Sequence, residues 1–282
     1  MGLKAFFSLL KQKCKGYYER RHTVITAQIT LSSPNEVLKG RNIVVTGGSR
    51  GLGFFIAKKC VDEGANVLIT ARNEDCLKES ALRLGERCKY AQLDMSDASG
   101  FHHFFEKAEE ILGCNKIDSV IGNAGMTIIE NSFLYVTEES WNKQIDLNLK
   151  GNYFFIQEFV RYLLKKPDTK GNVVIVASER GLRSAEIPYD ISKVGVKNFI
   201  QGIAPTLVTK NIRINGVAPG ACSTDIKDFD ENANLYRFLQ VNQRFYKPEE
   251  VAEVVNFLLS DFSSCISGEV IACDNGNYIS KW

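Results

Sequence analysis

Short apolar segments alternate with longer amphipathic segments along most of the chain, and this alternation limits the fold more than any other feature. The apolar segments have the length and composition of buried strands; they lie at residues 43–46, 67–70, 90–93, 119–121, 173–177, 212–217 and 270–273. Helices are expected between them, including residues 99–112, 141–164, 189–209 and 248–259. Joined by right-handed crossovers, these elements predict an α/β fold with a doubly wound parallel sheet.

The chain of 282 residues shows no second-domain linker, so we expect one domain over residues 41–282, preceded by a basic arm at residues 1–40. Residues 1–21 have the pattern of a basic amphipathic helix, and residues 23–31 have the composition of a strand. We expect the arm to dock on the protein's own body or on a second subunit. Peripheral contact with an anionic membrane through residues 1–21, and disorder, are the less favoured alternatives.

The composition excludes several classes of function. Lys and Arg total 35 against 33 Asp and Glu, which gives no electrostatic reason to expect nucleic acid as a partner. The 8 cysteines are scattered without metal-site spacing and the 3 histidines do not complete such a site, so we expect no metal. Scattered, unpaired thiols predict a reducing, cytoplasmic location.

A glycine cluster follows the first expected strand and precedes a helical segment. It reads Thr46-Gly-Gly-Ser-Arg-Gly-Leu-Gly53. Gly47 permits a sharp turn, Gly51 lets the backbone approach a pyrophosphate, and Gly53 permits close packing of the helix, whose N-terminus favours negative charge. In the order strand, turn, helix, this cluster predicts the dinucleotide site of a Rossmann fold.

The end of the next strand bears on the choice of cofactor. NAD-binding Rossmann folds place an acidic residue there, whereas this chain has Arg72. Arg72 and Arg50 are suited to bind the 2′-phosphate of NADP. The sequence therefore favours NADP(H), and NAD(H) stays open as the alternative.

From about residue 40 onward, the chain resembles the single-domain branch of the short-chain dehydrogenase/reductase family. The matching motifs occur in order and comprise the TGxxxGxG turn, Asp94, Asn123-Ala124-Gly125, Asn148, Ser178, Tyr189 with Lys193 in YxxxK, Pro219-Gly220 and Thr224. With the turn, this resemblance implies a cofactor site made by Gly47, Ser49, Arg50, Gly51, Leu52, Gly53, Arg72, Asp94, Met95, Asn123, Ala124, Gly125, Tyr189, Lys193, Pro219, Gly220 and Thr224.

The YxxxK spacing has a chemical meaning of its own. Residues four apart on a helix share a face, so Tyr189 and Lys193 are expected to point together. A neighbouring ammonium stabilises a phenolate, so we expect it to lower the pKa of Tyr189 and make it a general acid or base. Ser178 ends a strand, where its hydroxyl can bind the substrate oxygen. The resemblance implies that Asn148 anchors a proton relay to Lys193, that Pro219 and Gly220 shape the loop beside nicotinamide, and that Thr224 binds its carboxamide.

Two features depart from the family pattern. Ser178 and Tyr189 are eleven residues apart, about two fewer than the family usually has. Glu179, Arg180 and Arg183 then follow the serine, which suggests a polar or anionic substrate or simply solvated charges. Residues 225–244 occupy the region that covers substrate in the family, and we expect a mobile lid there.

The sequence thus predicts an enzyme that moves a hydride between nicotinamide and a carbonyl or secondary alcohol of a small substrate. A 3-oxoacyl-carrier-protein reductase is the nearest alternative; it needs a basic surface, for which Arg161, Lys165 and Lys166 are weak candidates. Enoyl reduction fits less well, because those enzymes space Tyr and Lys more widely. A nucleotide-binding scaffold or sensor is the alternative of another class. The resemblance also implies a homodimer or homotetramer built on the two long helices.

Overall fold

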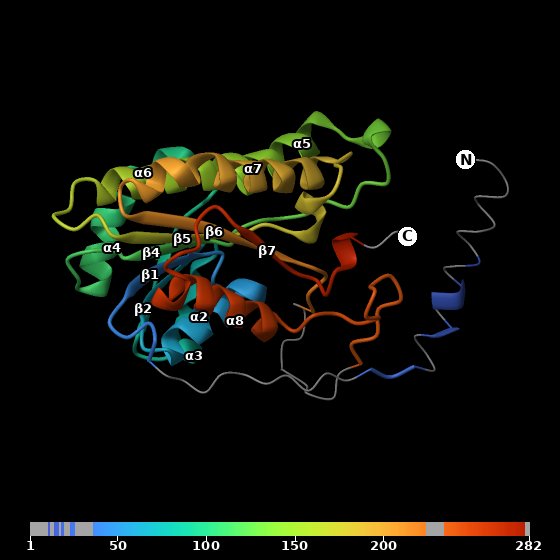
Figure 1. Ribbon diagram of the computed structural model, residues 1–282, viewed down its shortest axis with the longest axis horizontal. Helices are drawn as coiled ribbons and strands as arrows, with labels where there is room; N and C mark the ends of the chain where they lie inside the picture. The colour runs from blue at the N-terminus through green and yellow to red at the C-terminus, as the bar shows by residue number, and fades with distance from the viewer. Residues whose placement is uncertain are drawn as a thin grey trace.

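A seven-stranded parallel sheet with helices on both faces forms the body of the protein (Figure 1). The computed structural model describes residues 11, 14–16, 18–19, 23–25, 36–223 and 234–279. The strands are β1 (Asn42–Thr46), β2 (Asn66–Ala71), β3 (Cys88–Gln92), β4 (Ser119–Gly122), β5 (Gly171–Val176), β6 (Ile212–Pro219) and β7 (Val270–Cys273). Their order is β3-β2-β1-β4-β5-β6-β7, so the order reverses between β1 and β4. The predicted α/β fold and all seven predicted strands are confirmed.

Helices cover the sheet in two layers, each with its own apolar core. The main helices are α2 (Gly51–Asp62), α3 (Glu74–Leu84), α4 (Phe104–Leu112), α5 (Glu138–Ile145), α6 (Asn152–Leu163), α7 (Pro188–Val208) and α8 (Pro248–Leu259). One core packs α2, α3 and α8 on the sheet, and the other packs α4, α6 and α7 on the opposite face (Figure 1). Because both faces are covered, the central strands are apolar on both sides, as β5 is throughout its length.

Two predicted helices are interrupted in the structure. The segment expected at 99–112 consists of a 3-10 turn at Ala98–Phe101 and then α4, because His103 adopts a left-handed backbone with φ of 59° that a helix cannot continue. The segment expected at 141–164 begins earlier, at Glu138, where the Thr137 side chain caps the helix. It also contains a π-turn at Asp146–Gly151 between α5 and α6.

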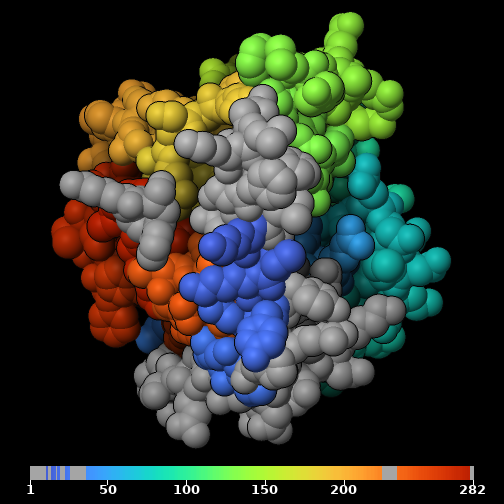
Figure 2. Space-filling view, turned by 90° about the vertical axis from the view of Figure 1, so that its right-hand side faces the viewer, coloured from blue at the N-terminus to red at the C-terminus, as the bar shows by residue number. Residues whose placement is uncertain are grey.

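The arm is described only in part. Thr23, Val24 and Ile25 belong to no strand, and residues 26–31 of the predicted strand lie outside the described residues. The described arm residues lie against the segment that begins at Asn234, seen as blue beside orange in Figure 2. Of the predicted alternatives for the arm, these residues show docking on the protein's own body. No helix within the described part of the chain is long and apolar enough to cross a membrane.

Aromatic rings hold the core between α4, α6 and the sheet. Phe105 lies 5.1 Å from Phe155 and 5.2 Å from Phe159, measured between ring centroids. Phe105, Phe155 and Phe159 are almost fully buried. Such clusters contribute through both buried area and favourable ring geometry. This cluster therefore fixes α6, and with it the π-turn that precedes α6.

We predict that Phe159→Ala lowers the free energy of unfolding by about 3–5 kcal/mol, because it leaves a cavity in a packed core. Denaturant unfolding followed by circular dichroism measures this loss. The control is Leu82→Ala on α3, where the side chain is 76% exposed, and the loss expected there is below about 0.5 kcal/mol. Equal losses in the two variants would contradict this account of the core.

Candidate active site

The glycine turn joins β1 to α2 at the carboxyl edge of the sheet, and its glycines are required by geometry. Gly47 has φ of +65°, the left-handed conformation that glycine adopts readily. A Cβ at Gly53 would lie 2.2 Å from the Gly47 carbonyl oxygen, so α2 approaches the turn as closely as the sequence predicts. The Asn123 amide donates to the carbonyl oxygens of Thr46 (2.9 Å) and Gly47 (3.1 Å) and so ties the end of β4 to the turn.

A groove of about 760 Å³ opens between this turn and the ends of β2 and β4. Twelve residues of the predicted cofactor set line it, namely Gly47, Ser49, Arg50, Gly51, Leu52, Gly53, Arg72, Asp94, Met95, Asn123, Ala124 and Gly125. The groove therefore brings together the residues that the turn, the β2 end and the NAG motif contribute separately. Asn73, Cys76 and Leu147 also line it and were not predicted.

The groove is positively charged at the end of β2, where NAD-binding Rossmann folds have an acidic residue that binds the ribose. Arg50 and Arg72 are exposed, and among the described residues no carboxylate forms an ion pair with either guanidinium. Asn73 follows Arg72 and caps α3 through a hydrogen bond from the Cys76 amide (2.8 Å). A capping residue at this strand end is a signal that sequence reasoning had available and did not use.

Ser178, Tyr189 and Lys193 converge at the end of β5. The Ser178 side chain accepts a hydrogen bond from the Arg180 amide (3.2 Å), which starts a 3-10 turn at Glu179–Leu182. This turn packs directly on α7, because a Cβ at Gly181 would lie 2.5 Å from the Lys193 carbonyl oxygen. The compact turn explains how an eleven-residue spacing still brings Ser178 close enough to the Tyr189 side chain to influence its pKa.

Lys193 and Tyr189 share a face of α7, as predicted, but their electrostatics differ from the prediction. Lys193 Nζ lies 5.9 Å from the centroid of the Tyr189 ring and donates a hydrogen bond to the Val176 carbonyl oxygen (2.9 Å). Burial lowers the pKa of Lys193 to about 8. Burial also raises the pKa of Tyr189, and its hydrogen bond to Ser178 does not compensate. The expected lowering of the Tyr189 pKa is therefore wrong: burial of the phenol raises its pKa, and the Lys193 amine binds the Val176 carbonyl oxygen and not the phenol.

Asn148 lies in the π-turn and is fully buried. Its side chain accepts from the Met126 amide (2.8 Å), donates to the Met126 carbonyl oxygen (2.9 Å) and donates to Ser192 Oγ (3.2 Å). Ser192 Oγ in turn donates to the Tyr189 carbonyl oxygen (2.6 Å). Ser192 thus connects Asn148 to α7, the helix that carries Tyr189. Sequence reasoning missed Ser192, although a small hydroxyl residue next to Lys193 was a signal for it.

The last predicted cofactor residues follow β6. Pro219 ends that strand, and the Gly220 amide donates to the Cys273 carbonyl oxygen (3.1 Å). A Cβ at Gly220 would lie 2.5 Å from the Tyr246 ring, so glycine is needed where Tyr246 covers this turn. Thr224 lies outside the described residues, as do residues 225–233 of the predicted lid.

The charges after Ser178 are engaged within the protein. Arg180 binds Asp190 through two hydrogen bonds of 2.8 and 2.7 Å. Arg183 donates to the Asn277 carbonyl oxygen (2.6 Å) and lies 3.7 Å from Glu179. A cavity of about 250 Å³ lies beside these arginines and Asp190. These side chains are therefore not simply solvated. Their partners within the protein also neutralise part of the positive charge that could bind an anion.

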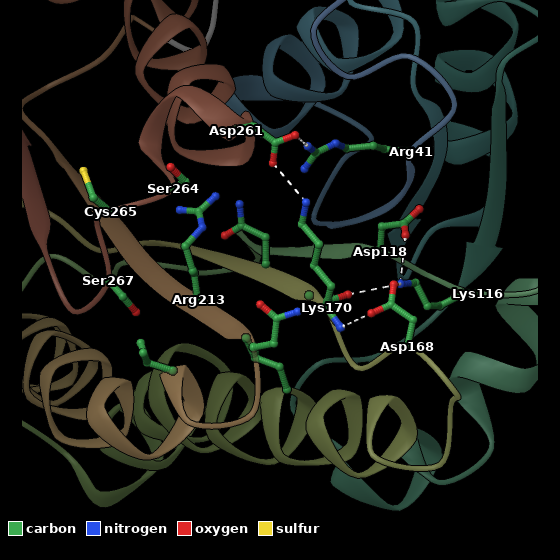
Figure 3. A pocket seen from close by; sticks show the side chains of 15 residues that line it. Arg41, Lys116, Asp118, Asp168, Lys170, Arg213, Asp261, Ser264, Cys265 and Ser267 are labelled. Carbon is green, nitrogen blue, oxygen red and sulfur yellow. Dashed lines mark hydrogen bonds and ion pairs between the residues drawn. The ribbon is translucent and has the colours of Figure 1, made fainter.

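A second charged pocket of about 600 Å³ lies at the opposite, amino edge of the sheet (Figure 3). Its charged groups pair with one another: Asp261 binds Arg41 (2.9 Å) and Lys170 (3.2 Å), and Lys116 binds Asp168 (2.8 Å). Ligands of parallel sheets bind at the carboxyl edge. We therefore place the chemistry beside Tyr189 and not here. No cluster with the composition of a metal site occurs among the described residues.

Comparison with known proteins agrees with this geometry. A family model described as Enoyl-(Acyl carrier protein) reductase matches residues 47–277. The chain is 34% identical to the 3-oxoacyl-[acyl-carrier-protein] reductase FabG of Chlamydia muridarum over 250 residues, which are 86% of this chain and 99% of that protein. It is 33% identical to FabG of Thermotoga maritima over 246 residues, covering 85% of this chain and 98% of that protein.

Solved structures show the same fold. A putative short-chain alcohol dehydrogenase from Sinorhizobium meliloti superimposes with a TM-score of 0.76 at 29% identity, covering 86% of this chain and 98% of that one. A putative gluconate dehydrogenase from Agrobacterium tumefaciens also has a TM-score of 0.76, at 24% identity, and supports the fold alone. The chain belongs to the short-chain dehydrogenase/reductase family and is an NAD(P)-dependent oxidoreductase acting on CH–OH or C=O groups.

Proposed function

We propose that this protein is an NADPH-dependent carbonyl reductase in which Tyr189 donates the proton to the substrate oxygen. The observation that carries the proposal is the convergence of Ser178, Tyr189 and Lys193 at the end of β5. Gly125 shows that these side chains adjoin the dinucleotide groove. It lines the groove, and a Cβ at this position would lie 3.7 Å from Lys193 Nζ. When bound, the nicotinamide supplies or accepts the hydride.

The protonation states favour reduction. Burial raises the pKa of Tyr189, so at neutral pH the side chain is a protonated phenol, which is the form a general acid requires. Ser178 polarises the carbonyl oxygen by hydrogen bonding. Lys193, whose pKa burial lowers to about 8, stays mostly cationic at neutral pH and returns a proton toward Tyr189. Asn148 and Ser192 hold the π-turn and α7 in register for that transfer.

NADP(H) is the cofactor that the groove fits best. Gly47 and Gly53 leave no room for side chains at the turn, and the N-terminus of α2 favours a pyrophosphate. Arg50 and Arg72, with no carboxylate bound among the described residues, suit the added negative charge of a 2′-phosphate. Pro219 and Gly220 are assigned to the nicotinamide end, and Asp94 and Met95 to the adenine end, as the family resemblance implies.

The substrate we favour is a small polar carbonyl compound. The small cavity beside the 3-10 turn that follows Ser178 is lined mostly by polar side chains, among them Glu130, Arg180 and Asp190, with Ile187 as its apolar member. A 3-oxoacyl-carrier-protein substrate is the second candidate, supported by the names of the relatives. The basic residues suggested for carrier binding are already paired, since Arg161 binds Glu158 and Lys166 binds Glu109. The four-residue Tyr–Lys spacing does not favour enoyl reduction, and convergence of the catalytic side chains argues against a pure scaffold.

We further propose that the protein assembles as a homodimer or homotetramer through α5, α6 and α7. Trp141, Tyr153 and Phe154 expose apolar area on these helices at 39%, 42% and 39% of their surfaces. Such a patch on a small protein is typical of an interface. A cytoplasmic location belongs to the same proposal and rests on the thiol-rich composition.

We predict that Tyr189→Phe lowers the rate of NADPH oxidation with a panel of ketones, aldehydes and keto-sugars at least about a hundredfold, because it removes the proton donor. Cofactor affinity, measured by NADPH fluorescence, stays unchanged. Tyr90→Phe on β3, a tyrosine outside the groove lining and outside the proposed interface, is the matched control and keeps full activity. Normal turnover in Tyr189→Phe would remove this mechanism.

Arg72→Ala is expected to weaken NADPH binding about tenfold or more while changing NADH binding little, because it removes a charge-assisted contact to the 2′-phosphate. Titration of both cofactors by fluorescence gives the two dissociation constants. Arg161→Ala, which removes an arginine on α6 outside the groove, serves as the control. Equal losses for both cofactors in Arg72→Ala would show that the preference arises elsewhere.

The pH dependence of reduction follows from Lys193. Its pKa of about 8 means that the ammonium predominates below that pH and is lost above it. We therefore expect kcat/KM for carbonyl reduction to be level below about pH 8 and to fall about tenfold per pH unit above it. Initial rates at saturating NADPH between pH 6 and pH 10, spanning roughly two units on either side, check this. A level profile throughout would contradict the role given to Lys193.

A further inference from the structure

The arm lies outside the region that the family model covers, which starts at residue 47. Its described residues nevertheless contact the segment that leads from β6 to α8. We call residues 234–246 the cleft segment, because they end against the turn that follows β6. Figure 2 shows the described arm residues, in blue, beside this segment, in orange.

The arm binds the start of the cleft segment through backbone and side-chain hydrogen bonds. The Leu235 amide donates to the Ile25 carbonyl oxygen (3.0 Å), and the Ile25 amide donates to Asn234 Oδ1 (3.2 Å). Asn234 Nδ2 donates to the Thr23 carbonyl oxygen (3.1 Å). One backbone bond and two bonds through the Asn234 side chain therefore hold the two stretches together.

A charged group completes this contact. The Tyr236 hydroxyl donates to Glu19 Oε2 (2.6 Å), and Tyr236 is 5% exposed. Burial, together with this hydrogen bond, raises the pKa of Tyr236 to about 12. A buried hydroxyl that loses a carboxylate acceptor is left with an unmet hydrogen bond, which is costly. Lys15 also lies over the Phe238 ring, at 5.9 Å from its centroid.

The cleft segment carries this contact to the turn after β6. The segment folds back on itself, since the Phe245 amide donates to the Leu235 carbonyl oxygen (2.8 Å). Tyr246 follows, and its amide donates to the Ala221 carbonyl oxygen (2.9 Å) while its ring covers Gly220. Gly220 belongs to the proposed nicotinamide end of the site.

A second connection runs from the middle of the segment to Ser178. The Val241 amide donates to Asn277 Oδ1 (3.2 Å), and Asn277 Nδ2 donates to Glu179 Oε2 (2.6 Å). Glu179 is buried and directly follows Ser178 in the chain. The cleft segment is therefore bonded to both sides of the proposed site, and the arm is bonded to the segment.

We propose that the described arm residues Lys15, Glu19 and 23–25 act as a strap that holds the cleft segment in place, with Glu19 and Tyr236 as positioning residues for the site. The strap keeps Tyr246 on Gly220 and keeps Val241 bonded to Asn277, which holds the Glu179 side chain, so it sets the wall against which substrate binds. The effect of the strap on catalysis rests on the proposed function. The claim that the arm holds the cleft segment rests only on the hydrogen bonds between them.

The test compares Glu19→Gln and Tyr236→Phe with Glu36→Gln in the full chain. Glu36 is a matched control, because it is an exposed carboxylate paired with Lys39 (2.6 Å) at the end of the arm. Hydrogen exchange is measured at the amides of Leu235, Val241 and Phe245. We expect roughly five- to tenfold faster exchange at all three in the two strap variants, the size expected from one lost hydrogen bond, and none in the control.

Kinetics supply the second measurement. In the strap variants, KM for the carbonyl substrate rises several-fold while kcat and the dissociation constant of NADPH change little. The strap acts on the substrate wall and the nicotinamide end of the site, and not on the groove that the glycine turn and Arg72 form for the rest of the dinucleotide. Asn234→Ala, which removes two other hydrogen bonds to the arm, is expected to show the same split.

The proposal is overturned if faster exchange is confined to Leu235, if the strap variants behave like Glu36→Gln, or if KM is unchanged in an active enzyme. Failure of the proposed function gives a different result. If the wild-type protein reduces no carbonyl compound, the exchange comparison still decides whether the strap holds the cleft segment.

Discussion

The contact of the Asn123 side chain with the glycine turn is the interaction on which the site depends. It joins β1 and β4, the two strands between which the strand order reverses, and it does so through the carbonyl oxygens of Thr46 and Gly47. Thr46 Oγ1 accepts hydrogen bonds from the Asn123 and Ala124 amides, which secures the same junction from the other side. Because these polar groups satisfy one another, the protein's own hydrogen bonds fix the shape of the turn that lines the groove.

The sequence predicted the fold well, for a physical reason. A parallel sheet covered on both faces requires strands that are apolar throughout, and such runs are visible in β1, β5 and β6 without further information. The glycines of the turn were also predictable, since Gly47 and Gly53 are needed by backbone geometry that few other residues allow. Helix interruptions were not predictable, because the left-handed conformation of His103 and the π-turn at Asp146–Gly151 depend on packing against distant segments. A Cβ at Gly151, for example, would meet the Met95 carbonyl oxygen.

Within the site, sequence reasoning found the side chains but not their electrostatics. The YxxxK spacing places Tyr189 and Lys193 on one face, yet it contains no information about the Val176 carbonyl oxygen that binds the amine. The charges of Arg180 and Asp190 are ten residues apart and read as independent, whereas the 3-10 turn after Ser178 brings them into a two-bond pair. Burial and local partners decide both outcomes, and these arise only when the chain has folded.

The π-turn before α6 also sets which face of α6 meets the sheet. A π-turn holds one residue more than an α-helical turn, so it absorbs a residue without advancing the helix. If this stretch became a regular helix with no residue removed, everything after it would rotate by about 100°. Phe155 and Phe159 would then leave the sheet, and Asn148 would turn away from Met126. The direction in which α6 packs is therefore decided by this one irregular turn, although the stretch reads as an ordinary helix.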